Sequence, residues 1–168
     1  MTAFELRSDA FRDFELFPEQ HTAVSPPLRW TDPPAETRSL ALVVERRPKE
    51  HTPWEETLAT EPETYWLAWG LPPHAGHLDA GASLLREGAG VTGAIGYRPT
   101  HTPQGHRRVL VFRLLALSEE LQLERGATRV EFMLAAAGLV LAEADLEAVW
   151  EPGKPLFYER VRNLLNRW

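Results

Sequence analysis

The chain has 168 residues, 43% of them hydrophobic, and a formal net charge of −6 with a pI near 5.5. This length and apolar content suit one domain with its own core, and the acidic balance offers no general attraction for nucleic acid or for an anionic membrane. The chain contains no cysteine, which excludes disulfides, thiolate metal sites and cysteine nucleophiles.

Proline and glycine punctuate the chain. The fourteen prolines and eleven glycines lie mostly between short apolar runs, a pattern typical of strands joined by turns. No apolar run approaches the roughly 18 residues of a membrane-spanning helix, and the N-terminal stretch carries Glu5, Arg7 and Asp9. We therefore expect a mostly β, cytoplasmic protein without integral membrane association.

Three segments are predicted to be core strands. Residues 39–44 form a continuous apolar run, which is typical of a central strand buried on both faces. Residues 64–69 are rich in aromatic side chains and stop at Gly70, so this strand is also expected inside the sheet. Residues 108–117 have charged ends around a β-branched and aromatic centre, which predicts a third core strand.

Long polar stretches separate these strands. Residues 45–63 contain three prolines and many carboxylates, and we interpret them as a long excursion or the tip of a hairpin. Trp54 lies in this acidic stretch, where it either contacts a partner or second subunit or packs back over the domain. Residues 72–105 hold most of the glycines and are predicted to frame one rim.

Helical spacing appears towards the end of the chain. One amphipathic helix ending near Gly138 is predicted by an apolar stripe of Val130, Met133, Leu134 and Ala137. After Pro155 a terminal docking helix is predicted by a second stripe, formed by Phe157, Val161, Leu164, Leu165 and Trp168. Residues 139–150 are ambiguous, because Ala and Glu favour a helix whereas Leu139 to Leu141 could begin a strand.

Several separated segments resemble the phosphatidylethanolamine-binding protein (PEBP) family, in its bacterial Raf-kinase-inhibitor-like branch. The matching segments, in the family's order and spacing, are residues 4–11, 24–30, 39–45, 96–97, 105–107 and 126–144. The most specific are Val24-Ser25-Pro26-Pro27-Leu28-Arg29-Trp30 and Val140-Leu141-Ala142-Glu143-Ala144. The resemblance implies a domain over residues 1–151, with a central antiparallel sheet packed on a smaller sheet, peripheral helices and a short strand at 139–144. Residues 152–168 would be a C-terminal helical extension packed on the same domain.

The resemblance also implies a small pocket for phosphate-like or carboxylate groups. Family members build it from an Asp-Pro-Asp-x-Pro motif, a His-Trp pair and a Gly-Tyr…His-Arg loop. Here the first motif is replaced by Arg46-Arg47-Pro48, the pocket histidine by Tyr65, and the usual acid before Val24 by Ala23. One wall of the pocket persists in the loop that carries Gly96-Tyr97, Pro99, Pro103, Gly105 and His106-Arg107.

The replaced motif points to altered chemistry. Guanidinium groups can hold a phosphate or carboxylate through charge-assisted hydrogen bonds, so Arg46 is a candidate anion ligand. The alternative is that Arg46 and Arg47 are a solvated pair in a loop, where they balance the charges of nearby glutamates such as Glu45. The predicted ligand-binding residues are Arg46, Tyr65, Tyr97, Pro99, His101 and His106.

Neither metal binding nor catalysis is predicted. His101 and His106, with His51 or Glu45, fall short of the ligand sets that metal sites use, and no cofactor motif is present. Ser25 has no Gly-x-Ser-x-Gly context and is expected in a structural turn. The sequence therefore predicts a non-catalytic binding protein for a small anionic ligand. The alternative is an interaction protein with a vestigial pocket, a homodimer for example, acting through residues 45–63 and the C-terminal helix; a hydrolase with an unrecognised site is a third class.

Overall fold

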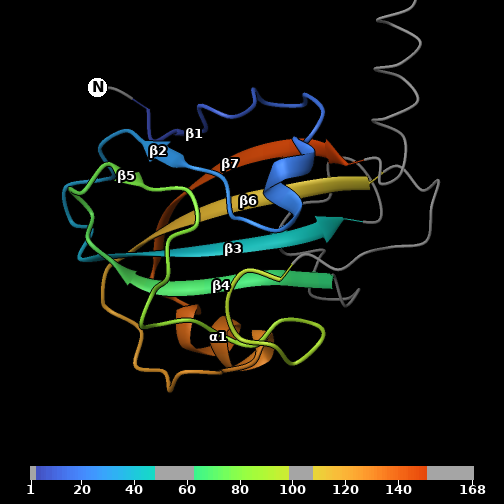
Figure 1. Ribbon diagram of the computed structural model, residues 1–168. Helices are drawn as coiled ribbons and strands as arrows, with labels where there is room; N and C mark the ends of the chain where they lie inside the picture. The colour runs from blue at the N-terminus through green and yellow to red at the C-terminus, as the bar shows by residue number, and fades with distance from the viewer. Residues whose placement is uncertain (1–2, 48–62, 99–107, 151–168) are drawn as a thin grey trace, which may run out of the picture.

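The computed structural model describes residues 3–47, 63–98 and 108–150 of the chain. In these residues two antiparallel sheets and one α-helix build a mostly β architecture (Figure 1). In chain order the elements are β1 (Leu6–Arg7), the 3-10 helix η1 (Glu19–Thr22), β2 (Leu28–Trp30), β3 (Ser39–Arg47), β4 (Glu63–Leu71), β5 (His77–Leu78), β6 (Arg108–Leu117), α1 (Arg129–Ala136) and β7 (Val140–Trp150).

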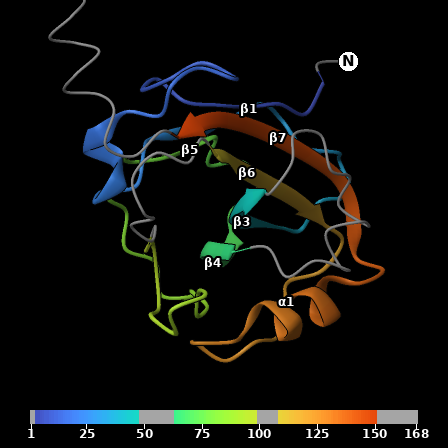
Figure 2. The ribbon, with the colours of Figure 1, turned by 90° about the vertical axis from the view of Figure 1, so that its right-hand side faces the viewer.

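The two sheets and the helix form layers. The larger sheet has the strand order β4-β3-β6-β7 and the smaller one β1-β2-β5, with antiparallel neighbours throughout. The smaller sheet packs on one face of the larger sheet, and α1 packs on the other (Figure 2). This arrangement confirms the expected fold class, a central antiparallel sheet on a smaller one.

β3 is the strand around which the larger sheet is built. It pairs with β4 on one side and β6 on the other, and no side chain from Leu40 to Val44 is more than 1% exposed. The prediction of a central strand buried on both faces is therefore confirmed. β6 begins and ends at the predicted residues. β3, however, continues to Arg47, so placing Arg46 and Arg47 in a loop was wrong.

β4 has buried side chains, yet it is an edge strand, which corrects the prediction that it lies inside the sheet. Its outer edge is covered by residues 86–98. The backbone N–H of Gly88 donates to the carbonyl of Leu67 at 2.9 Å, and that of Val91 donates to Thr64 at 2.9 Å. A strand whose edge is paired in this way needs no further strand to satisfy its backbone groups.

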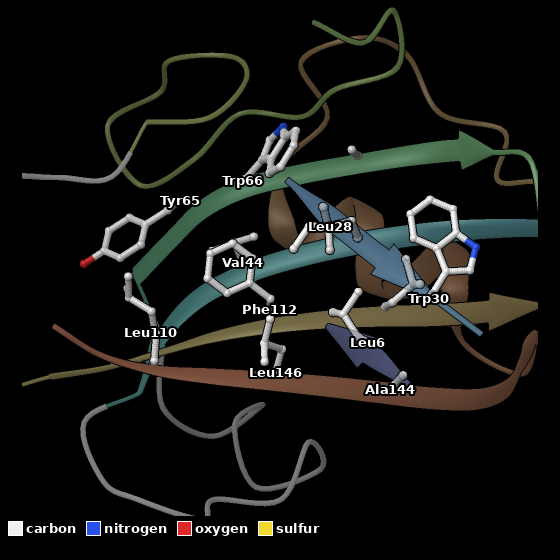
Figure 3. Packing of buried hydrophobic residues seen from close by; sticks show 14 of the residues in the cluster. Leu6, Leu28, Trp30, Val44, Tyr65, Trp66, Leu110, Phe112, Ala144 and Leu146 are labelled. Atoms are coloured by element: carbon white, nitrogen blue, oxygen red, sulfur yellow. The ribbon is translucent and has the colours of Figure 1, made fainter. Parts of the chain in front are cut away.

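The apolar layer between the sheets is the larger of the two cores. It joins Leu28 and Trp30 of β2 to Val44, Trp66 and Phe112 of the larger sheet (Figure 3). As expected of tryptophans, four of them are buried, with at most 8% exposed: Trp30, Trp66, Trp69 and Trp150. Trp54, Trp168 and the predicted C-terminal helix lie outside the described residues, as does the end of the predicted domain at 151.

The predicted amphipathic helix exists, but its predicted stripe was wrong. α1 begins with a capping box, in which Thr128 and Glu131 bind each other's backbone N–H, and it stops before Gly138, whose φ is +77°. Phe132 is 0% exposed, whereas Leu134 is 73% exposed and Val130 is 65% exposed. Apolar residues lie on both sides of this short helix, so spacing alone could not identify its buried face.

β7 settles the ambiguous segment as a strand, which is longer than the short strand that the resemblance favoured. One face of β7 packs towards the smaller sheet through Ala142, Ala144, Leu146 and Ala148. The residues that alternate with them are Glu143, Asp145 and Glu147. Period-two burial against β6 outweighs the helical propensity of Ala and Glu. In the described part of the chain no helix is long and apolar enough to cross a membrane.

Phe132 and Leu134 give a direct test of the corrected helix face. Phe132→Ala should lower the free energy of unfolding by about 3–5 kcal/mol, because it leaves a cavity between α1 and the larger sheet. Leu134→Ala should change it by less than about 0.5 kcal/mol, because most of that side chain is in water. Urea unfolding of both variants measures the difference, and equal losses would contradict the assigned face.

Candidate functional site

A β-bulge in β4 builds the centre of the candidate site. Val44 of β3 lies opposite Trp66, but the next residue, Glu45, lies opposite Thr64, so Tyr65 is an extra residue in β4. Both Tyr65 and Trp66 therefore join the core that faces the smaller sheet (Figure 3). Bulges commonly re-aim side chains beside functional sites. We call Arg46, Glu63, Tyr65, Trp66 and Tyr97 the Tyr65–Tyr97 site.

Trp66 lies at the centre of this site, between Tyr97 and Glu87. Its indole lies edge-on to the ring of Tyr97, with 5.4 Å between the ring centroids, and its Nε1–H donates to Glu87 Oε1 at 3.0 Å. Glu87 is 5% exposed and was missed by the sequence analysis, where only its place in a glycine-rich stretch beside an aromatic strand could have marked it. Gly96 makes room for this carboxylate: its φ is +91°, and a Cβ there would lie 3.2 Å from Glu87 Oε2.

Tyr97 ties the site to the 3-10 helix. Its hydroxyl donates to the backbone carbonyl of His21 at 2.6 Å, and the ring of His21 makes a hydrogen bond with the carbonyl of Val24 at 2.9 Å. Burial raises the pKa of Tyr97 well above its ordinary 10.0, because the phenolate would be desolvated. The Tyr97 hydroxyl therefore stays protonated and remains a hydrogen-bond donor to the His21 carbonyl.

Glu63 joins Arg46 to Tyr65. The Tyr65 hydroxyl donates to Glu63 Oε2 at 2.8 Å, and Arg46 Nη1 lies 3.0 Å from Glu63 Oε1. The Tyr65 ring also packs edge-on against Trp150, at 6.1 Å between centroids. Glu63 is a second residue that the sequence analysis missed. The signal was a carboxylate two residues before an aromatic, directly across the strand pair from an arginine.

Glu45 belongs to a different part of the molecule. Arg129 Nε of α1 lies 2.5 Å from Glu45 Oε1, on the face of the sheet that α1 covers. On the same face Arg113 makes two hydrogen bonds with Asp145, both 2.7 Å long. Glu45 and Arg113 are buried and each is paired, which offsets the cost of desolvating a charge, and the two pairs fasten α1 and β7 to the sheet. Glu45 is thus directed away from the Tyr65–Tyr97 site.

Three of the predicted ligand-binding residues lie in the described part of the chain: Glu63 joins Arg46 to Tyr65, whereas the side chain of Tyr97 contacts Trp66 and His21. Pro99, His101 and His106 lie outside the described residues. Within residues 3–47, 63–98 and 108–150 no three His, Asp or Glu side chains are placed to hold a metal ion. Ser25 is 2% exposed, and its Oγ accepts the N–H of Gly81 at 3.1 Å.

Two surface grooves lie away from these residues. A groove of about 560 Å³ is lined by β1, the residues after it and β7, and one of about 550 Å³ lies over β1 and β2. Neither is lined by Tyr65 or Tyr97. The buried aromatic and charged pairs mark the candidate site better than these grooves, because they converge on one end of β4.

The described residues of this site show no assembled acid, base and nucleophile. The rings of Tyr65 and Trp66 are 0% exposed, so the group that solvent can reach is the guanidinium of Arg46, which could donate to an anion in place of Glu63. Both tyrosine hydroxyls already donate to protein oxygens.

A comparison with protein families places residues 7–151 on the model named phosphatidylethanolamine-binding protein. Among individual relatives, the UPF0098 protein of Methanothermobacter thermautotrophicus is 32% identical over 159 residues, covering 88% of this chain and 99% of the relative. The UPF0098 protein of Chlamydia muridarum is also 32% identical, over 88% of this chain and 98% of its own length.

Solved structures agree with the fold. CT736 of Chlamydia trachomatis, described as a phosphatidylethanolamine-binding protein homolog, has a TM-score of 0.76 with 29% identity, over 89% of this chain and 97% of its own. Escherichia coli YbcL, described as a member of the mammalian PEBP family, has a TM-score of 0.75 with 18% identity, over 88% and 98% of the two chains. At 18% identity the second likeness concerns the fold alone.

Tyr97 makes stability depend on alkaline pH. Above pH 10.0 the unfolded chain loses this phenolic proton while the folded chain keeps it, so folding stability that is fully present below pH 10.0 declines as pH rises. Tyr97→Phe should make the decline shallower by up to about 1.4 kcal/mol per pH unit. At pH 7 it should cost about 1 kcal/mol, because the His21 carbonyl loses its donor. Urea unfolding at several pH values measures both, and parallel declines would contradict the prediction.

Proposed function

The chain belongs to the phosphatidylethanolamine-binding protein family, and on this premise we propose that it is a non-catalytic binding protein with an altered pocket. The ligand is a small molecule that enters through a phosphate or carboxylate group. The pocket is the Tyr65–Tyr97 site, completed by Pro99, His101 and His106 of the loop that resembles the family's. The family's Asp-Pro-Asp motif and pocket histidine have no counterparts here, so the family's own head-group is not assumed.

The observation that carries this proposal is the position of Arg46. It lies near the end of β3, two residues after Val44 and so on the same face, it is joined to Tyr65 through Glu63, and 25% of its side chain is exposed. A partly exposed guanidinium near aromatic rings is a suitable hydrogen-bond donor for an anionic group. Arg46 is ion-paired with Glu63, so an incoming anion must compete with this carboxylate.

A non-catalytic role is supported by the groups that catalysis would use. Ser25 is buried and binds Gly81, Glu45 is paired with Arg129, and Glu63 is paired with Arg46. A hydrolase needs a nucleophile beside a base, or two carboxylates in different environments and facing one substrate. In the described residues these candidates point to different partners and to different faces of the sheet.

The competition at Arg46 gives a gain-of-binding test. Glu63→Gln removes the competing charge but keeps an oxygen for the Tyr65 hydroxyl, so inorganic phosphate should bind about three- to tenfold more tightly, a change near 1 kcal/mol. Glu36→Gln, at an exposed residue of another loop, is the matched control and should change nothing. Isothermal titration with phosphate, and with acetate for the carboxylate class, measures both.

Two outcomes would overturn the proposal. If neither the wild-type protein nor Glu63→Gln gives heat at millimolar phosphate or acetate, anion binding is absent. If Arg46→Ala binds as tightly as the wild-type protein, another group holds the anion.

One specific observation favours a second candidate function. Arg46 and both tyrosine hydroxyls already have protein partners, which is what a vestigial pocket would show. In that case the chain acts through protein contacts made by residues 45–63 and the C-terminal segment. Absent heat in the titrations, together with a mass above that of a monomer by light scattering, would support this candidate.

A further inference from the structure

A row of three basic side chains crosses the outer face of the smaller sheet. In the register of this sheet Arg7 of β1 lies directly opposite Arg29 of β2, and Arg29 lies directly opposite His77 of β5. The alternate residues Leu6 and Leu28 point into the core (Figure 3), so the three basic side chains face solvent, each of them at least 60% exposed. We call Arg7, Arg29 and His77 the basic row.

This row has an energetic cost. Side chains that lie directly opposite each other on antiparallel strands have their Cβ atoms about 5 Å apart, and like charges in such positions destabilise a sheet. β1 and β5 are each two residues long, so the backbone pairs that offset this repulsion are few. The repulsion between Arg7 and Arg29 would be relieved most by an anion that contacts both guanidinium groups.

Each basic side chain of the row has its own carboxylate. The pairs are Arg7 with Glu5 at 2.6 Å, Arg29 with Asp9 at 2.6 Å, and His77 with Asp79 at 3.8 Å. All three carboxylates are at least 46% exposed, and exposed ion pairs are weak, so an anion of higher charge can replace them. A guanidinium also has five N–H donors, which is more than one carboxylate uses.

A groove beside the row gives such an anion a place to bind. It is the groove of about 550 Å³ over β1 and β2, and it is lined by Arg7, Arg29 and Gly76 together with Glu5, Trp30 and Thr31. Gly76 leaves its wall open, because a Cβ at this position would meet no heavy atom within 4 Å. The backbone N–H of Trp30 donates to the Gly76 carbonyl at 2.9 Å, which fixes this part of the wall.

We propose that the basic row and this groove form a second anion-binding site, which takes a ligand with two linked phosphate groups. Guanidinium groups match the geometry of phosphate oxygens and bind them through paired, charge-assisted hydrogen bonds. Two linked phosphates can pair with Arg7 and Arg29 at once, whereas a single carboxylate such as Glu5 satisfies one of them. The site lies away from the Tyr65–Tyr97 site and does not depend on the proposed function.

Calorimetric titration with inorganic pyrophosphate tests this site in a chain that carries Arg46→Ala, which removes the anion ligand proposed for the Tyr65–Tyr97 site. Adding Arg29→Gln should weaken binding at least about tenfold, because Arg29 is the central residue of the row. Arg38→Gln is the matched control, since it removes the same charge from an exposed arginine elsewhere, and it should change the affinity by less than about twofold.

These titrations separate the two sites. Because Arg46 is absent from every chain compared, a lack of heat with millimolar pyrophosphate counts against the second site alone. If Arg38→Gln weakens binding as much as Arg29→Gln does, the attraction is a general effect of charge, and the proposal is wrong.

Gly76 gives a second test that leaves both arginines in place. Gly76→Asp adds a carboxylate to the groove, whereas Gly76→Asn adds a neutral side chain of nearly the same shape, and both residue types tolerate the φ of +75° at this position. The aspartate variant should bind pyrophosphate at least about fivefold more weakly than the asparagine variant. Equal affinities would show that the anion does not enter this groove.

Orthophosphate and succinate identify the class of ligand. At equal ionic strength, weaker binding of both than of pyrophosphate supports a ligand with two linked phosphates. If either of them binds as tightly as pyrophosphate, paired contact of two phosphates with Arg7 and Arg29 is not what the site recognises, and the proposal fails.

Discussion

The extra residue in β4 is the constraint on which the candidate site depends. A regular strand would send Tyr65 and Trp66 to opposite faces of the sheet. The bulge instead directs both rings to the face of the smaller sheet, while Thr64 and Glu45 remain on the face covered by α1. The aromatic rings and the charged cluster under α1 therefore lie on opposite faces of the larger sheet, and the polar groups of each face find their partners there. Without the bulge, Tyr65 would meet neither Glu63 nor Trp150.

Charge pairing then decides what the site can do. On the α1 face, the buried Glu45 has Arg129 as its counter-ion and the buried Arg113 has Asp145. At the Tyr65–Tyr97 site the pair formed by Arg46 and Glu63 is partly exposed, so its desolvation has cost less and its geometry is easier to rearrange. The same kind of interaction therefore fastens the fold on one face of the sheet and forms a partly exposed ion pair on the other.

Part of this structure could be predicted from individual segments. β3 and β6 could be predicted as core strands, because a continuous apolar run with charged ends is stable in few environments other than the interior of a sheet. The buried face of α1 could not, because Val130 and Leu134 are as apolar as the residues that the helix buries. The edge position of β4 is determined by residues 86–98, which its own sequence does not describe. Glu63 became visible as a site residue only through the register of β3 and β4, since neither of its partners adjoins it in the chain.

The covering of β4 has a consequence for how the protein behaves in concentrated solution. An exposed edge strand rich in aromatic residues is a template for pairing with other chains, and it promotes aggregation. Residues 86–98 remove that template by binding the backbone of β4. Gly90 allows the close approach, because a Cβ there would lie 2.7 Å from the Thr64 carbonyl oxygen of β4, and Gly88 fits between Leu67 and the Ala127 carbonyl oxygen, which a Cβ would approach to 2.6 Å. We therefore expect these two glycines to matter for solubility as well as for the fold. A side chain at either position would displace residues 86–98 and expose the edge of β4.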